Sequence, residues 1–173
     1  MADQAREEII KQLPNLRRFA FGLTGNIQDA DDLVQMACER ALTRLHQWEQ
    51  GTRMDSWMYR IIQNLWLDGK RKLKLRAESA KPDVLEQLID ENAHRVTEVQ
   101  NSLAATVYAL DGLSEDQRSV LLLVSVEGYS YKEAAEILDI PIGTVMSRLA
   151  RARLALYEAL HAPTKTSHQG KSK

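Results

Sequence analysis

The sequence predicts an all-α protein made of two small helical domains joined by a flexible linker. Three observations support this fold class: apolar residues recur at helical spacing in two separate stretches, aromatic and glycine residues are few, and an acidic segment lies between the stretches. The chain has 173 residues, of which 44% are hydrophobic. The predicted boundaries are 1–77 for the first domain, 78–110 for the linker, 111–161 for the second domain and 162–173 for a disordered tail.

Three helices are predicted in the first domain. Residues 7–23 carry apolar side chains at steps of three and four, and glycines close the segment. Residues 29–47 form a second amphipathic segment, with acids near the N-terminus of its polar side, where the helix dipole favours negative charge. A third helix starts near residue 56, and the side chains that it is expected to bury are Trp57, Ile61 and Leu65.

The third helix runs into a basic stretch, Lys70 to Arg76, which holds five cationic residues. Such a stretch is most often a solvated helix C-terminus. The aromatic residues nearby favour a second interpretation, because bases of a single strand stack on aromatic faces while cations neutralise the phosphates. We expect Trp57 to be buried and at least one other aromatic residue to face outward; the aromatic residues concerned are Trp48, Trp57, Tyr59 and Trp66.

A change in composition separates the two domains. Between residues 81 and 111 there are two basic and six acidic side chains, and the apolar period is weak. This composition predicts a mobile linker with some helical tendency. The second domain opens at Leu113, after which Ser114 and Gln117 have the spacing of a helix capping box.

Residues 128–153 predict a helix-turn-helix. Ser130 and Glu133 repeat the capping-box spacing, so the first helix of the motif should begin directly after Ser130. Pro141 and Gly143 are expected to end it. A simple amphipathic hairpin with a solvated side is the alternative interpretation.

The second helix of the motif has an apolar stripe and a basic outer face. Its apolar residues are Val145, Leu149, Ala152 and Leu156, and its outer face offers Thr144, Ser147, Arg148 and Arg151. Residues 143–157 hold three arginines and no acid, although the whole chain has 23 basic and 24 acidic residues. Arginine and hydroxyl side chains suit the DNA major groove, so this helix is a candidate DNA reader.

Several other functions are not indicated by the sequence. The single cysteine, Cys38, lies among apolar positions and predicts a small buried side chain in a reducing cytoplasm. The longest apolar run, residues 120–124, is far short of the ~20 residues of a membrane span. The histidines share no metal-ligand spacing, and no phosphate loop or nucleophile motif occurs. We therefore expect a soluble cytoplasmic protein that is not an enzyme and has neither metal nor cofactor.

Four motifs in order resemble those of the bacterial extracytoplasmic-function (ECF) sigma factors. They are Leu-Thr-Gly-Asn-Ile-Gln-Asp-Ala-Asp-Asp-Leu-Val-Gln at 23–35, the segment at 57–72 that starts Trp-Met-Tyr-Arg, Leu-Ser-Glu-Asp-Gln-Arg at 113–118, and Gly-Thr-Val-Met-Ser-Arg at the start of 143–153. The resemblance implies a promoter-specificity subunit of RNA polymerase, with a sigma region 2 bundle followed by a sigma region 4 helix-turn-helix.

The resemblance also implies three binding surfaces. The residues that would dock on the polymerase clamp are Asp29, Asp31, Asp32 and Gln35. The residues that would capture the opened, single-stranded minus-ten element are Trp48, Asn64, Asp68, Lys70, Arg71 and Lys72. The residues that would read the duplex minus-thirty-five element are Thr144, Ser147, Arg148, Arg151 and Arg153.

The implied partners are core RNA polymerase, promoter DNA and an anti-sigma factor. Two alternatives stay open at this point. A stand-alone helix-turn-helix regulator would leave the aromatic and basic residues of the first domain unused, and a sigma-like interaction protein would leave the basic outer face unused. We further expect the linker to let the two domains change their relative position on binding.

Overall fold

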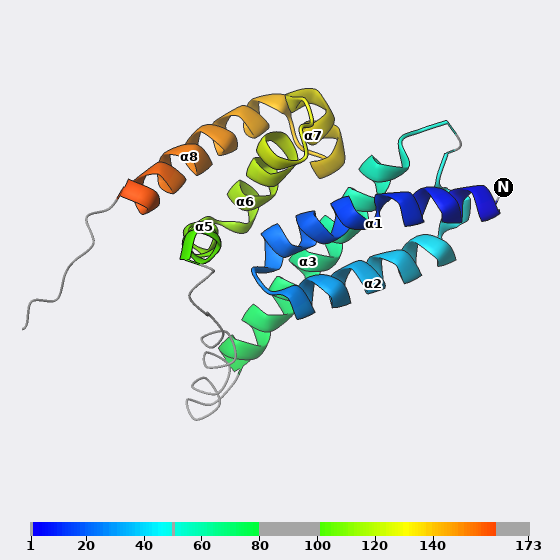
Figure 1. The fold of residues 1–173 in the computed structure, drawn as a ribbon, viewed down its shortest axis with the longest axis horizontal. Helices are drawn as coiled ribbons and strands as arrows, with labels where there is room; N and C mark the ends of the chain where they lie inside the picture. Colours follow the sequence, from blue (N-terminus) through cyan, green and yellow to red (C-terminus); the bar gives the residue numbers. More distant parts are fainter. Residues whose placement is uncertain (1, 50, 80–100, 162–173) are drawn as a thin grey trace, which may run out of the picture.

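Long helices form the first half of the molecule (Figure 1). The computed structural model describes residues 2–49, 51–79 and 101–161. The elements of this half are α1 (Ala2–Thr24), α2 (Ile27–Thr43), the 3-10 turn η1 (Leu45–Gln47) and α3 (Met54–Ser79). α1 packs on both α2 and α3. The side chains at the centre of this bundle, Leu16, Phe19, Leu23, Met58 and Ile62, are fully buried.

Shorter helices form the second half. They are α5 (Asn101–Asp111), α6 (Glu115–Leu121), a π-helical turn η3 (Leu122–Val126), α7 (Tyr131–Leu138) and α8 (Ile142–His161). α8 packs on α5, α6 and α7. Both predicted capping boxes are confirmed, because the side chains of Ser114 and Ser130 each accept a hydrogen bond from the N3 main-chain N–H, while the N3 side chain accepts one in return.

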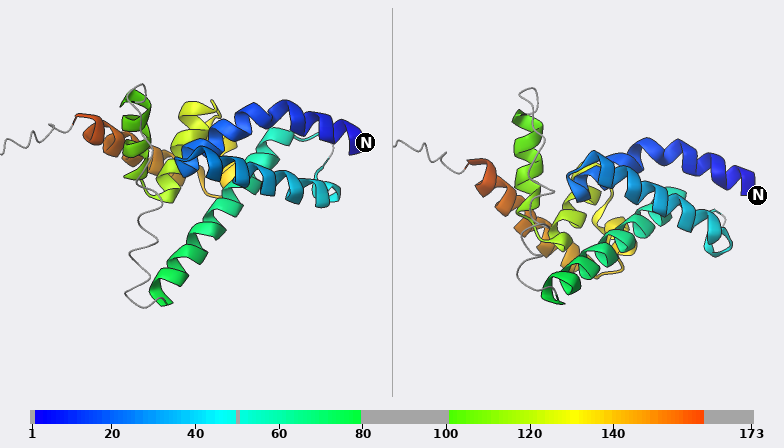
Figure 2. Two further views of the ribbon diagram at one scale, coloured as in Figure 1. Left: turned by 60° about the horizontal axis from the view of Figure 1, so that its bottom comes forward. Right: turned by 90° about the horizontal axis from the view of Figure 1, so that it is seen from below.

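The two halves lie against each other in both views of Figure 2, and they share one hydrophobic core. α7 lies against α3, and η3 lies against α1. The halves lie close together at Gly22, where a Cβ atom would stand 2.5 Å from the Cδ2 atom of Leu122. A side chain at this position would therefore force the Leu122 side chain of η3 to move.

The buried side of α3 differs from the predicted one. The helix begins at Met54, and Met58, Ile62 and Trp66 are buried, whereas Trp57 and Leu65 are only half-buried. Ile61 is buried as predicted, whereas Trp57 and Leu65 are only partly buried and pack against the edge of the core. The physical reason is that α3 contacts α1 and α2 on one side and α7 on another, so its buried face is set by two partners rather than by one stripe.

Three predicted boundaries also shift. α1 extends to Ala2, and α2 ends at Thr43 before the 3-10 turn, rather than at residue 47. Gly143, expected to end the first helix of the motif, lies inside α8; α7 ends instead at Leu138, and its C-cap Asp139 adopts a left-handed conformation with φ 54°. This cap lets the main chain turn within a few residues.

Helical structure also occupies part of the predicted linker. α3 continues to Ser79, and α5 begins at Asn101, so residues 101–110 belong to a helix that contacts α8. Residues 80–100 of the linker, and the tail from 162 to 173, lie outside the described residues. The two halves are in contact in this structure, so the predicted change in their relative position requires these contacts to break.

Candidate nucleic-acid and polymerase interface

The outer face of α8 is exposed as the sequence predicts. Val145, Leu149 and Ala152 are buried against the rest of the second half, and this packing turns Ser147 and Arg151 toward solvent. Arg153 is also exposed, and Thr144 is half-buried. Within the described part of the chain neither Arg151 nor Arg153 makes an ion pair, so both guanidinium groups are free to meet a ligand.

Arg148 differs from the other two arginines of α8. Its Nη2 atom lies 2.8 Å from Oδ2 of Asp116, and its side chain is 27% exposed. Asp116 belongs to the first turn of α6, so the acid comes from another helix and could not be seen in the charge pattern of α8. The pair holds the Arg148 side chain at the edge of the exposed face.

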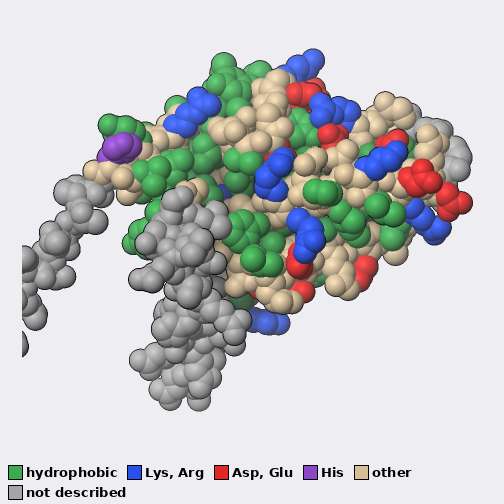
Figure 3. All heavy atoms as spheres, in the orientation of Figure 1, with side chains coloured by type: hydrophobic (Ala, Val, Ile, Leu, Met, Phe, Trp, Pro, Cys, Tyr) green, Lys and Arg blue, Asp and Glu red, His purple; other side chains and the backbone are tan. Residues whose placement is uncertain are grey.

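The exposed side of α8 also carries apolar side chains, which the sequence analysis did not predict. Figure 3 shows apolar atoms at the surface along α8. The large apolar residues of this helix that are exposed are Ile142, Met146, Leu154, Tyr157 and Leu160. Together with the arginines they give α8 a mixed basic and apolar surface, of a kind that can meet both DNA and protein.

The acids of α2 are exposed to different degrees. Asp29, Asp32 and Gln35 are exposed, and Gln35 donates a hydrogen bond to Glu39. Asp31 is half-buried and accepts a bidentate pair from Arg17, with N–O distances of 2.8 and 2.9 Å. Asp31 therefore has a cationic partner within the chain, whereas neither Asp29 nor Asp32 forms an ion pair with any described residue.

The predicted single-strand residues fall into two places. Trp48 lies beside the loop before α3, whereas the others lie on the exposed C-terminal part of α3, which extends away from the bundle in Figure 1. Arg71 lies 3.6 Å from Asp68, and Lys70 stands 5.8 Å from the centre of the Trp66 ring. The predicted residues of this part are all exposed, namely Asn64, Asp68, Lys70, Arg71 and Lys72.

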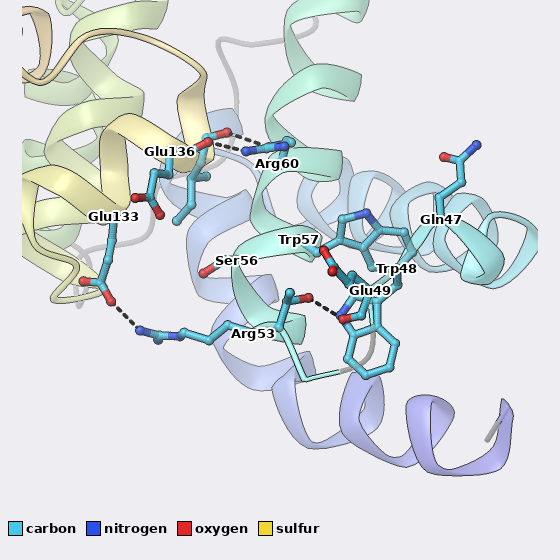
Figure 4. Close-up of a pocket in the computed structure, with 11 residues that line it drawn as sticks. Gln47, Trp48, Glu49, Arg53, Ser56, Trp57, Arg60, Glu133 and Glu136 are labelled. Carbon is cyan, nitrogen blue, oxygen red and sulfur yellow. Dashed lines mark hydrogen bonds and ion pairs between the residues drawn. The ribbon is translucent and has the colours of Figure 1, made fainter.

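No aromatic residue of this cluster is fully exposed. Tyr59 and Trp66 are buried, and Trp48 and Trp57 are half-buried. The expected outward aromatic residue is therefore not found. Instead, Trp48 and Trp57 line a cavity of about 430 Å³, drawn in Figure 4. The Nε1 atom of Trp48 is buried and has no hydrogen-bond partner in the described residues.

The walls of this cavity come from both halves. The first half contributes the loop before α3 and the first turns of α3, including Arg53 and Arg60. The second half contributes Glu133, Glu136 and Ile137 of α7. Of these two arginines and two glutamates, only Glu133 was predicted from the sequence, and only as a helix-capping residue, because the partners across the cavity lie 76 to 80 positions away in the chain.

Arg53 is the most strongly held cation of this cavity. It pairs with Asp55 at 2.8 Å and with Glu133 at 2.6 Å, and its guanidinium stands 4.8 Å from the centre of the Tyr129 ring. The hydrogen bond with Asp55 raises the pKa of Arg53. Burial tends to raise the pKa of Asp55, but hydrogen bonds from Arg53, Tyr129 and the Ser56 main chain outweigh it and lower that pKa.

The fold and these surfaces define a two-part, all-helical protein with a helix-turn-helix DNA reader. Residues 104–156 match the family model for Sigma-70 region 4, and residues 9–63 match the model for the Sigma2 domain of PhyR. The ECF RNA polymerase sigma factor EcfG of Rhodopseudomonas palustris is 35% identical over 161 residues, which cover 93% of this chain and 87% of the relative. The ECF RNA polymerase sigma factor SigW of Bacillus subtilis is 30% identical, covering 83% of this chain and 81% of the relative.

The chain therefore belongs to the ECF RNA polymerase sigma factors. Among solved structures it is similar to the sigma factor RpoE of Bartonella quintana, crystallised with the anti-sigma factor NepR, with a TM-score of 0.73, 30% identity and coverage of 91% of this chain and 97% of that chain. CnrH in complex with the cytosolic domain of CnrY has the same fold, with a TM-score of 0.71 at 23% identity. The family resemblance and the all-α fold class predicted from the sequence are confirmed.

The described residues contain no helix that is long and apolar enough to cross a bilayer. They also contain no group of three or more histidine, cysteine and acidic side chains placed to hold a metal ion.

Proposed function

We propose that this protein directs core RNA polymerase to a specific set of promoters and helps to open them. Family membership sets this class of function, since sigma factors are transcription regulators. The main observation in support of the proposal is the two-sided character of α8. One face of this helix is buried in the core, and the opposite face presents Arg151 and Arg153, which form no ion pair with the described residues.

α8 is proposed to read the duplex minus-thirty-five element. Arginine pairs bidentately with guanine in the major groove or binds phosphate, and short hydroxyl side chains fit close to the DNA backbone. The ion pair with Asp116 fixes where the Arg148 side chain points. Arg151 and Arg153 are proposed as direct contacts, and Arg148 as a contact whose orientation α6 controls.

The cavity beside α3 is proposed to receive a base of the opened minus-ten strand. Extruding a base from the duplex costs a few kcal/mol, which stacking and hydrogen bonds in a pocket must offset. Trp48 and Trp57 supply aromatic surface on which a base can stack. The basic part of α3 is proposed to hold the phosphates that follow. No nucleotide hydrolysis enters this mechanism.

α2 is proposed to dock on core polymerase through Asp29, Asp32 and Gln35. These side chains are exposed, and the two acids are free of internal cations in the described chain. We further propose an anti-sigma partner, because the RpoE relative was crystallised with one and covers 91% of this chain. The exposed apolar residues of α8 offer such a partner a surface.

Run-off transcription of fragmented genomic DNA with purified core polymerase tests the proposal. Addition of the protein should produce a discrete set of transcripts whose start sites share two upstream sequence elements. A stand-alone regulator would instead bind duplex DNA without core polymerase and yield no new transcripts. An interaction protein would neither bind DNA nor change transcription.

A further inference from the structure

A carboxylate of α6 reaches the DNA-facing side of α8. Asp116 lies in the first turn of α6, and its Oδ2 atom stands 2.8 Å from Nη2 of Arg148. α6 and α8 pack against each other (Figure 1), so the core of the second half fixes the spacing between the two main chains. The ion pair therefore ties an arginine of the proposed reading helix to a neighbouring helix.

Arg148 is restrained in a way that Arg151 is not. The side chain of Arg148 is 27% exposed and has a charged partner, whereas Arg151 is exposed and forms no ion pair with the described residues. A long side chain loses rotamer freedom when it binds a ligand. Arg148 has given up part of that freedom before DNA arrives, so ordering it on DNA costs less than ordering Arg151.

The ion pair leaves the guanidinium of Arg148 able to donate hydrogen bonds. A guanidinium carries five N–H donors in one plane, and among the described residues only Nη2 of Arg148 has a partner. Two of the remaining donors can meet O6 and N7 of guanine, a contact that requires a defined orientation of the plane. A phosphate accepts hydrogen bonds from many directions and carries no sequence information. A restrained plane therefore favours a base over a phosphate.

Asp116 also brings negative charge to the DNA-facing side. Its side chain is 52% exposed, so the protein does not enclose the carboxylate. A negative charge close to the duplex repels phosphates whatever the sequence, because every base pair brings the same backbone charge. The favourable effect of Asp116 on Arg148, in contrast, is gained only at a matching base. The carboxylate thus weakens binding to wrong sequences more than to the right one, which raises discrimination.

We propose that Asp116 is a positioning residue that sets sequence specificity: it holds Arg148 for one base pair of the minus-thirty-five element and disfavours phosphate binding on other sequences. The inference rests on the proposed function of α8 as the reader of that element. Asp116 acts through Arg148 rather than by contact with a base. An exposed ion pair contributes little to stability, so this role is separable from the fold.

Two acids at the same helix end provide a matched pair of variants. Asp116→Asn removes the charge beside Arg148 and keeps the size of the side chain. Glu115→Gln is the control, because Glu115 lies in the same first turn of α6, is exposed and forms no ion pair with any described residue. Both changes remove one negative charge near the N-terminus of α6, so their effects on the helix dipole are alike. Thermal melts should show equal stability; a lower melting temperature of Asp116→Asn alone would mean a structural role and overturn the proposal.

The first measurement is the base preference of the holoenzyme. Core polymerase with the full chain is bound to duplex promoters that run-off transcription has identified and that are randomised in the minus-thirty-five element, and the bound fraction is sequenced. Arg148→Ala should abolish the preference at one base pair. Asp116→Asn should lower the preference at that same base pair by roughly 2- to 10-fold, the effect of having to order one long side chain on DNA, and Glu115→Gln should leave it unchanged. The double variant of Asp116→Asn with Arg148→Ala should match Arg148→Ala, because both changes act through one contact.

The second measurement is the salt dependence of binding to duplex DNA that lacks a promoter sequence. The freed Arg148 of the Asp116→Asn variant can pair with a phosphate, so this variant should bind such DNA more tightly than the wild type does, and its affinity should fall more steeply with salt. Base preferences and salt slopes equal to those of Glu115→Gln would overturn the proposal, as would a loss of preference spread over the whole element. A wild-type holoenzyme without any preference in this element would contradict the proposed function, whereas a wild-type preference that survives Asp116→Asn contradicts only the role of Asp116.

Discussion

The outer face of α8 and the cavity beside α3 are both assigned to promoter DNA, yet their surroundings differ. Arg151 and Arg153 of α8 project into solvent, whereas Arg53 and Arg60 at the cavity are bound by α7. One surface is ready in the free chain, and the other is covered by the chain itself. On the proposed assignments, recognition of promoter DNA depends on the arrangement of the halves as well as on the residues at each surface.

The largest effect is expected at the polymerase-docking face. Asp32→Lys should abolish association with core polymerase, because reversing a charge at an interface typically costs several kcal/mol. Asp31→Asn should have a much smaller effect, since Asp31 is already neutralised by Arg17. Pull-down of core polymerase measures both. An equal loss of polymerase binding in the two variants would show that the exposure of each carboxylate does not determine its contribution to docking.

A smaller effect, on stability alone, is expected at the seam. Arg118 is 6% exposed and donates hydrogen bonds to the main-chain carbonyls of Leu23 and Leu110, at 2.7 and 2.5 Å. Arg118→Met should lower the free energy of unfolding by about 2 to 3 kcal/mol, because buried carbonyls lose their donors. Urea denaturation checks this, with Arg6→Met as an exposed control. An unchanged midpoint would mean that Arg118 does not join the halves energetically.

A substitution on the outer face of α8 should instead weaken DNA binding and leave the stability of the fold unchanged. Arg151→Ala should weaken binding to promoter duplex by about 1 to 3 kcal/mol without changing the melting temperature. Asp116→Ala should weaken it less, because that change frees Arg148 without removing it. Fluorescence anisotropy with duplex DNA distinguishes the two. Loss of stability in Arg151→Ala would refute the assignment of this side chain to the exposed face.

The smallest expected effect is a change of the free energy of unfolding with pH, caused by Asp55, the partner of Arg53 at the cavity. The pKa of Asp55 is lowered in the folded state, so the carboxylate stabilises the fold above its unfolded pKa of about 4. This contribution is lost as the pH falls through the lowered folded pKa. Thermal melts between pH 2 and 5 should show a steeper loss for the wild type than for Asp55→Asn. Asp68→Asn, on the exposed end of α3, is the control and should follow the wild type.

The parts of the structure that were predicted correctly depend on residues close together in the sequence. Each capping box joins residues three positions apart, and the burial of Val145, Leu149 and Ala152 in α8 follows from the helical repeat, although Leu156 of the predicted stripe is only half-buried. Both can be read without knowing what packs nearby. The promoter and polymerase contacts assigned to α2, α3 and α8 remain predictions, although the structure places most of these side chains at the surface.

The parts that were not predicted depend on distant residues. Trp57 and Leu65 are half-buried because α7 packs on α3 and changes which side of α3 is covered. Arg18 and Glu127 are separated by 109 positions, so their pairing leaves no periodic signal. The sequence indicated two helical units, but it held no local signal that they would pack together through buried charge.

Promoter-directed transcription is the central claim, and one comparison tests it most directly. Core polymerase is supplied with genomic DNA and either the wild type, Arg151→Ala or the control Lys132→Ala, an exposed cation on α7, and transcript start sites are sequenced. The account predicts a shared pair of upstream elements for the wild type and the control, and selective loss of transcripts for Arg151→Ala. Absence of promoter-specific transcripts with the folded wild type, or transcripts unaffected by Arg151→Ala, would contradict it.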